Sequence, residues 1–303
     1  MKRRHFLRTT ASGGALAAAA AANPLDHRLL GADDSRTPGG WQLGCFTRPF
    51  GEFTYAEALD GIAAAGFTAV GLMNARLASG NVPLSTATAA QVAEIGDEAA
   101  KRGLAISATY YGGPPVADSL EAGIAALRRL VDNCAAAKCA TILLGGTSKE
   151  DLFDAYYQAV KSVCDYAAAE GVALVLKPHG GLNTTGAQVR DIVKAIDHPA
   201  FRAWYDPGNI YYYTEGATDP LDDVADLAGL VTGMCVKDFQ APREVAVNPG
   251  SGLVDFPELM KRLAQGGFVA GPLVVETLAP GDLSATVASA TKAREFLEGI
   301  LAG

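Results

Sequence analysis

The chain has 303 residues, of which 49% are hydrophobic and 19% are charged, and its net charge is -8. This length and hydrophobic content are sufficient for one large barrel domain. The acidic balance excludes a typical nucleic-acid partner, because no cluster of Lys or Arg that could form a basic face follows the first eight residues. After residue 30 no apolar run is long enough for a spanning helix, so we expect no stable membrane insertion of the mature protein.

The first residues are similar to an export signal. Arg3 and Arg4 precede Phe6 and Leu7, and an alanine-rich run with small residues follows to about residue 23. This order is typical of a twin-arginine signal peptide, and a basic tail with a chance Arg-Arg pair is the alternative. We therefore expect a signal peptide over residues 1–23, a linker over 24–40, and a periplasmic or other extracytoplasmic location.

From Trp41 onward, apolar runs alternate with segments of helical periodicity. The runs predict strands over 41–48, 69–74, 105–111, 141–146, 173–179, 202–209, 231–238 and 272–278. The periodic segments predict helices over 54–67, 88–103, 119–138, 149–171, 184–196, 219–230, 255–267 and 282–301. Strands that are apolar throughout are typical of a sheet buried on both faces. Eight such units predict a single (β/α)8 TIM barrel over residues 41–303, and no Gly-rich phosphate turn follows the first strand to favour an open sheet.

Five cysteines lie in this region: Cys45, Cys134, Cys139, Cys164 and Cys235. They contain no CxxC pair, and an odd number without a spacing pattern argues against a disulfide framework. We expect most of them to be small, buried, apolar residues.

Polar residues stand at the ends of the last four predicted strands. They are Lys177 and His179, Asp206 and Asn209, Lys237 and Asp238, and Glu276. The carboxyl ends of barrel strands lie on one rim, where active sites are built, so these side chains are expected to converge on one pocket.

Each of these residues has a functional and a structural interpretation. Asp206 suits a metal ion or a sugar hydroxyl, or it caps the turn that follows. Glu276 is costly to bury unless it is paired, which indicates catalysis or an ion pair with Lys237. Lys177 suits an electrophile or base, or a salt bridge to Glu276. His179 shares a face with Lys177 and suits a ligand, a proton carrier or a hydrogen-bonded rim residue.

Three further features lie near the predicted rim. Lys237 and Asp238 are adjacent, so one is expected to face the pocket and the other the helices. The glycines of Gly250 to Gly252 offer backbone amides to an anion or a sugar hydroxyl, or they simply form a turn. The aromatic run from Tyr211 to Tyr213 lines the mouth of the barrel or belongs to the core.

The segments YDPGNIYYYTEG, VKDF and PGSGLVDFPELMKRLAQGGFVAGPLVVET resemble the xylose-isomerase-like TIM-barrel superfamily of sugar isomerases, epimerases and inosose dehydratases. The resemblance covers roughly residues 41–300. It implies a divalent cation, often Mn, Mg, Co or Zn, at the carboxyl-terminal rim. The usual ligands are a Glu on a middle strand, an Asp in a D-x-G-H/N segment, a His before the Lys-Asp pair, and a Glu on the last strand.

This ligand set is only partly present. Asp206 matches the Asp and Glu276 the last Glu, whereas Cys235 stands in place of the His and Lys177 in place of the middle Glu. The KPHGG segment is similar to the HPHxGT stretch of some members, with His179 at the second His. A cation would therefore be held by Asp206, Glu276 and His179, or the Lys177 ammonium stands where the cation stood.

Together with the predicted export signal, the resemblance implies an exported sugar or keto-sugar isomerase or epimerase, or a dehydratase, that abstracts a proton next to a carbonyl. Glu276 would be the base, Lys177 or a cation would stabilise the enolate oxygen, and His179 would assist. Contacts to the carbohydrate would come from Asn209, Lys237, Asp238 and Tyr211. The alternative is a non-catalytic carbohydrate-binding barrel that has lost the metal site. The sequence leaves open whether the chain forms a homo-oligomer.

Overall fold

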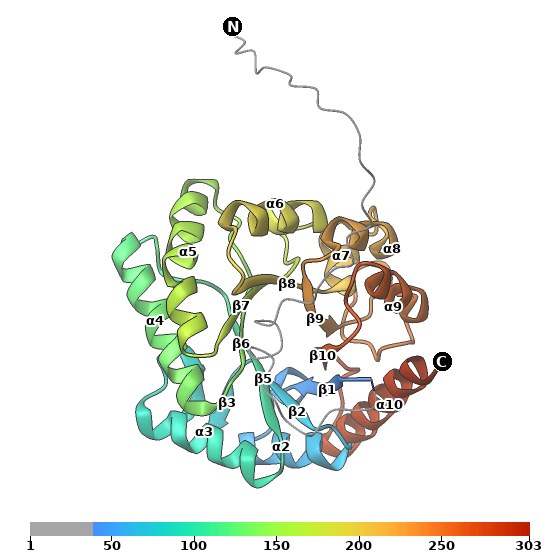
Figure 1. The fold of residues 1–303 in the computed structure, drawn as a ribbon. Helices are drawn as coiled ribbons and strands as arrows, with labels where there is room; N and C mark the ends of the chain where they lie inside the picture. Colours follow the sequence, from blue (N-terminus) through green and yellow to red (C-terminus); the bar gives the residue numbers. More distant parts are fainter. Residues whose placement is uncertain (1–38) are drawn as a thin grey trace, which may run out of the picture.

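The computed structural model describes residues 39–303 (Figure 1). The predicted signal peptide and the linker up to residue 38 lie outside the described residues, so export stays a prediction. Over residues 39–303, no helix combines the length and the apolar character that crossing a membrane requires.

Eight parallel strands close into a barrel in the order β1-β10-β9-β8-β7-β6-β5-β2 (Figure 1). Their bounds are β1 Trp41–Phe46, β2 Ala69–Leu72, β5 Ala105–Tyr111, β6 Thr141–Leu144, β7 Ala173–Leu176, β8 Phe201–Tyr205, β9 Val231–Val236 and β10 Gly271–Val275. The predicted (β/α)8 fold is confirmed. Most strands end two or three residues earlier than predicted, so the polar residues follow the strands. A hairpin of β3 Ala75–Leu77 and β4 Gly80–Val82 was not predicted.

Seven long helices surround the barrel in the described part of the chain (Figure 1). They are α2 Tyr55–Ala64, α3 Ala89–Lys101, α4 Leu120–Ala137, α5 Phe153–Ala169, α6 Gly186–Ile196, α9 Phe256–Gln265 and α10 Leu283–Ala302. Local sequence determines their ends. Thr54 and Glu57 form a reciprocal capping box at the start of α2. Gly66 and Gly103, with φ of 88° and 68°, follow α2 and α3 in a backbone conformation that favours glycine.

The sixth unit differs from its prediction of one helix over 219–230. The chain forms α7 Pro207–Tyr213, α8 Pro220–Asp223 and the 3-10 helix η5 Val224–Leu227. The helix α7 begins directly after β8 because the Asp206 side chain accepts a hydrogen bond from the Asn209 amide, and Pro207 suits the first helical position. This early helix places Asn209 close to the end of β8.

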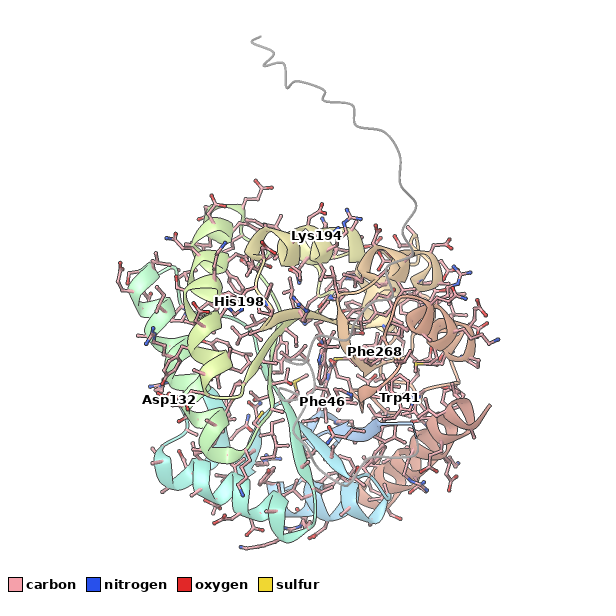
Figure 2. All side chains as sticks on the ribbon, in the orientation of Figure 1. Trp41, Phe46, Asp132, Lys194, His198 and Phe268 are labelled. Carbon is pink, nitrogen blue, oxygen red and sulfur yellow. The ribbon has the colours of Figure 1, made fainter. Side chains whose placement is uncertain are left out.

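The core has two layers. Inside the barrel, one cluster fills the space between the strands: Phe46, Ala108, Leu143, Val175, Trp204, Cys235 and Val274. A Cβ at Gly233 would lie 2.4 Å from the Trp204 ring, so glycine there leaves room for the indole. The larger layer lies between the strands and the helices. Figure 2 shows Phe46 within the ring of strands, and Asp132 and Lys194 on the outer helices. All five cysteines are free and buried, as predicted.

Candidate active site

Four charged residues directly follow four neighbouring strands. Lys177 comes after β7, Asp206 after β8, Lys237 after β9 and Glu276 after β10. Because the strands are parallel and adjacent, these residues share the carboxyl-terminal rim. None of them is more than 2% exposed. We call these four residues the ion cluster.

Each ammonium group of the ion cluster bridges both carboxylates. The Lys177 Nζ lies 3.0 Å from Asp206 Oδ2 and 2.6 Å from Glu276 Oε2. The Lys237 Nζ lies 3.1 Å from Asp206 Oδ2 and 2.7 Å from Glu276 Oε1. Charges of opposite sign therefore alternate around a closed circuit, which compensates the cost of burying four charges.

Arg48 adds a third cation from the segment after β1, the strand that pairs with β10. Its Nη1 donates to Glu276 Oε1 at 2.8 Å, and its side chain is 45% exposed. This residue is not among those predicted from the sequence. Arg48 stands at the end of the first predicted strand. The residues of the ion cluster also stand near the ends of their predicted strands, so this position is the sequence signal that identifies Arg48.

The ion cluster controls the protonation of its members. Burial by itself raises the pKa of Glu276, but the Lys177 and Lys237 charges outweigh burial and hold this pKa well below its usual range. Burial by itself lowers the pKa of Lys177, but the surrounding negative groups raise this pKa well above its ordinary value. Glu276 is thus a carboxylate and Lys177 an ammonium near neutral pH. Glu276 is a weak proton acceptor, because three cations compete with the proton for its oxygen atoms.

His179 lies outside the ion cluster, among aromatic rings. Its Nε2 is 3.4 Å from the Tyr110 hydroxyl, and its ring centroid is 5.4 Å from that of Tyr213. Burial, together with the positive charges of Lys177 and Lys237, lowers the pKa of His179 to about 4. The imidazole is therefore neutral near pH 7 and can accept a proton. Tyr110 was not singled out in the sequence, since it lies within a predicted strand, whereas Tyr213 belongs to the aromatic run that was.

Asn209 links three segments of the rim. Its Oδ1 accepts a hydrogen bond from Lys237 Nζ at 2.9 Å, and its Nδ2 donates to the Pro178 carbonyl at 2.7 Å. Its amide nitrogen also donates to Asp206 Oδ1 at 3.0 Å. Asn209 thus fixes Asp206 and Lys237 relative to the loop that carries His179.

Two predicted substrate ligands lie elsewhere. Tyr211 stacks on Phe239, with ring centroids 5.4 Å apart, so Tyr213 is the member of the aromatic run beside His179. Asp238 points away from the ion cluster. Its carboxylate accepts four backbone hydrogen bonds, from the amides of Phe239, Gly250, Gly252 and Val254. The anion that the Gly250 and Gly252 amides bind is therefore the chain's own Asp238. Of the adjacent residues Lys237 and Asp238, Lys237 is the one that faces the rim.

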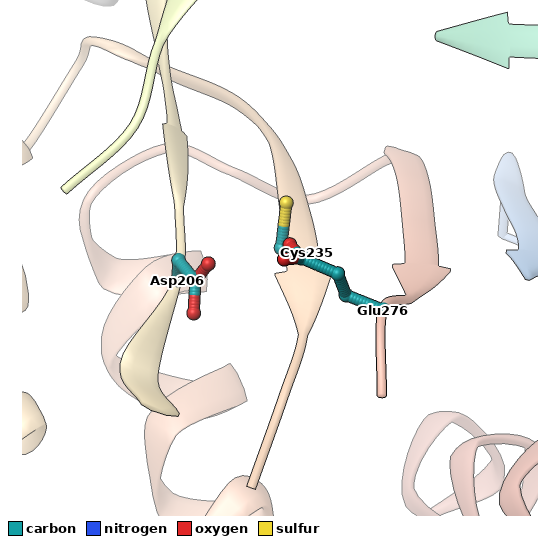
Figure 3. A group of neighbouring side chains, drawn as sticks. All are labelled: Asp206, Cys235 and Glu276. Carbon is teal, nitrogen blue, oxygen red and sulfur yellow. The ribbon is translucent and has the colours of Figure 1, made fainter. Parts of the chain in front are cut away.

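A metal-type group is present, but its composition differs from the one predicted. Asp206, Cys235 and Glu276 have ligand atoms within 4.8 Å of one another, and His179 is not a member (Figure 3). Burial raises the pKa of Cys235 well above its ordinary value, so it remains a thiol. Lys177 Nζ also lies 4.0 Å from Cys235 Sγ, in addition to its two carboxylate contacts. These residues, with an ammonium among them, do not fit a divalent cation.

A cavity of about 440 Å³ opens beside Arg48. Its lining is mostly neutral: Met73, Asn74, Pro83, Ser85, Tyr110, Tyr111 and Gly112. Both Arg48 and Tyr110, the neighbour of His179, face this space. The cavity can therefore bring a small polar molecule to an exposed guanidinium and to Tyr110, whose hydroxyl is next to the neutral imidazole of His179.

Comparison with curated proteins finds no match. Solved structures similar to this fold include a D-psicose 3-epimerase with D-tagatose from Clostridium cellulolyticum H10, at 17% identity over 86% of this chain and 99% of that chain, with a TM-score of 0.68. A xylose isomerase-like TIM barrel protein from Mycobacterium smegmatis, in complex with magnesium, has 17% identity over 86% of this chain and 98% of that chain, with a TM-score of 0.70.

A third similar structure is a probable 3-DHS dehydratase from Bacillus anthracis, at 14% identity over 84% of this chain and 98% of that chain, with a TM-score of 0.66. At these identities the likeness concerns the fold. The sequence itself matches the xylose isomerase-like TIM barrel family over residues 59–300. Since this match spans most of the chain, and the barrel carries its polar residues at the carboxyl-terminal rim, the chain belongs to the xylose isomerase-like TIM barrel family.

Proposed function

We propose that this chain is a sugar-modifying enzyme that moves a proton next to a carbonyl group, as an isomerase, epimerase or dehydratase. The observation that carries the proposal is the pairing of Arg48 with the buried ion cluster beside a cavity, with neutral His179 nearby. The family membership and the sugar epimerase and dehydratase among similar folds support the substrate class.

The geometry favours His179 over Glu276 as the base. In the proposed step, the C–H bond next to the carbonyl breaks and its proton passes to a ring nitrogen of His179. The electron pair moves toward the carbonyl, whose oxygen becomes an enolate beside the Arg48 guanidinium. Return of this proton from the imidazolium to the neighbouring carbon, with transfer of the neighbouring hydroxyl proton to the enolate oxygen, gives an isomer. Delivery of a proton from a water molecule to the other face gives an epimer. Transfer of the imidazolium proton to a departing β-hydroxyl releases water and gives dehydration.

In this proposal the ion cluster positions the reacting groups without touching the substrate. Lys177 and Lys237 are buried and already donate to the carboxylates. They hold Glu276 as a carboxylate, and Glu276 fixes Arg48 at the edge of the cavity. Arg48 therefore takes the oxyanion-stabilising role that was predicted for Lys177 or a cation.

The test is proton exchange in D₂O with a panel of keto-sugars and inososes, followed by NMR. Wild type should replace the proton next to the carbonyl with deuterium, and His179→Gln and Arg48→Met should not. His198→Gln and Arg190→Met are the matched controls, because these residues pair with surface carboxylates. An absence of exchange and of product with every compound would refute the proposal.

A second candidate is a carbohydrate-binding barrel without catalysis. The saturated contacts of Lys177 and Lys237 favour it, because buried and fully paired lysines supply no acid or base to a ligand. Calorimetric binding of a sugar with no product by chromatography would establish this candidate in place of the enzyme.

We also infer that the protein meets its carbohydrate outside the cytoplasm, on the strength of Arg3 and Arg4 and the alanine-rich run. A free or oxidised sugar is then a better candidate than a sugar phosphate. Replacing both arginines by lysine should retain an uncleaved precursor in the cytoplasm. Normal processing of that variant would contradict the inference.

A further inference from the structure

The point where three metal-type ligands converge already holds a cation. Asp206, Cys235 and Glu276 turn one oxygen or sulfur atom each toward a common space, as Figure 3 shows for their side chains. The Lys177 Nζ contacts all three: it lies 3.0 Å from Asp206 Oδ2, 2.6 Å from Glu276 Oε2 and 4.0 Å from Cys235 Sγ. Among the residues in the described part of the chain, this is the one such group.

The contacts of Lys177 and Lys237 differ in a way that assigns the central position to Lys177. Both ammonium groups contact Asp206 and Glu276, but Lys237 directs its remaining contact to Asn209 Oδ1 at 2.9 Å, while Lys177 faces the Cys235 sulfur. Lys237 thus flanks the group, and Lys177 lies within it. The Lys177 side chain, which follows β7, therefore supplies the positive charge that balances the Asp206 and Glu276 carboxylates.

We propose that the Lys177 ammonium takes the place of a divalent cation, so that this barrel holds Glu276 and Arg48 in position by a built-in charge and works without a bound metal. The inference that Lys177 replaces a cation rests on the contacts of its ammonium group. The statement that the enzyme works without metal also rests on the proposed function. A fixed ammonium supplies one charge and no open coordination position, which agrees with a substrate-facing guanidinium as the electrophile.

Cobalt titration tests the proposal without any assay of activity. Wild type should bind no Co²⁺ at the rim. In Lys177→Ala, the freed Asp206, Cys235 and Glu276 should bind one Co²⁺ at least about tenfold more tightly than wild type does. Binding should release the Cys235 proton and produce a thiolate-to-cobalt absorption band. The added substitution Cys235→Ser should remove that band. Lys237→Ala is the matched control, and should gain no such affinity because Lys177 still fills the group.

Each outcome decides the proposal. Stoichiometric Co²⁺ or Mn²⁺ binding by wild type at the rim overturns it, and so does a folded Lys177→Ala that gains no affinity. Equal gains in Lys177→Ala and Lys237→Ala also overturn it, because Lys177 would then have no special position. Lys177→Glu, which restores a carboxylate, is the second variant. If neither variant folds, wild-type binding contradicts the proposal and its absence supports it.

Activity gives a separate readout. Turnover by wild type should survive removal of metals with a chelator, and loss of turnover that Mn²⁺ restores would overturn the metal-free statement. If no sugar is turned over, the proposed function fails, but the cobalt titration still decides whether Lys177 stands in for a cation. The two failures are therefore distinguishable.

Discussion

The two halves of the barrel rim differ in charge and in burial. The half formed by β7 to β10 carries the ion cluster, which is almost completely buried. The half formed by β1, β2, β5 and β6 borders the cavity, and Arg48 is the charged residue among those that line this cavity. The buried half can hold charge in place, whereas the open half offers space and exposed polar groups.

This difference indicates that the two halves of the rim have different roles. Ion pairs that are buried on all sides contribute little net stability against desolvation, but removal of one partner leaves an uncompensated charge. The ion cluster therefore has to stay complete, which favours a positioning role. Residues of the open half can change without this penalty, so the choice of substrate is expected to depend on them.

The largest effect should come from breaking the buried half. Lys177→Ala removes a cation that contacts both Asp206 and Glu276, and should lower the free energy of unfolding by on the order of 3 kcal/mol. Urea unfolding measures this change. Lys101→Ala, which removes an exposed lysine paired with Glu98, is the control and should leave the midpoint unchanged. Equal midpoints for both variants would contradict the division between the two halves.

A second change addresses the open half. Arg48→Met should leave the free energy of unfolding nearly unchanged, because this side chain is half-exposed. It should lower kcat/KM by about 100-fold or more, as loss of one oxyanion-stabilising donor does elsewhere. Arg190→Met serves as the control. A large loss of stability together with unchanged kcat/KM would show that Arg48 has a structural role, like the residues of the buried half.

His179 follows β7 and contacts Tyr110 at the end of β5, so it links the two halves of the rim. The pH dependence of its protonation tests how strongly the buried half acts on it. Its pKa in the folded protein is about 4, below the ordinary value of 6.5, so it is neutral at all higher pH. A base with this pKa gives a kcat/KM that is flat above about pH 5 and falls as pH decreases through 4. His179→Gln should lower kcat/KM by about 100-fold and remove that fall. A fall centred near pH 6.5 in wild type would show that burial does not control this group.

The same titration changes stability in a defined direction. Between pH 6.5 and 4, an unfolded chain binds a proton at His179 and the folded protein does not, so stability decreases as pH falls through this window. The difference in unfolding free energy between wild type and His179→Gln should follow this decrease. Urea titrations at several pH values measure it, with His198→Gln as the reference. A difference that does not vary with pH would contradict the lowered pKa.

Most of the fold could be predicted because the strands are apolar and their helices start at recognisable caps. The capping box of Thr54 and Glu57 and the terminating Gly66 are examples in which neighbouring residues alone determine the boundary. The sixth unit could not be predicted in the same way. Pro207 was interpreted as a turn after a strand, whereas with Asp206 as cap it begins a helix.

The site could be predicted as a set of residues but not as a set of contacts. Position at a strand end was sufficient to select Lys177, Asp206, Lys237 and Glu276, which meet. The same rule also selected Asp238, whose direction depends on hydrogen bonds to the loop over 239–254, which follows it directly and donates from as far as 16 residues along the chain. Which side chain faces the rim is decided by such long-range hydrogen bonds, and a pattern of neighbouring residues does not contain them.

The smallest predicted effect concerns that loop, which is hydrogen-bonded to Asp238 after β9. Asp238→Asn replaces an acceptor of four backbone amides with a group that has one oxygen, so some amides lose their partner. Unfolding free energy should fall by about 1–2 kcal/mol. Hydrogen exchange at Gly250, Gly252 and Val254 should accelerate, while exchange in β2 and β5 stays unchanged. Asp191→Asn, at an exposed carboxylate, should change neither quantity. Equal acceleration in both halves of the rim would show that the loop does not belong to the buried half alone.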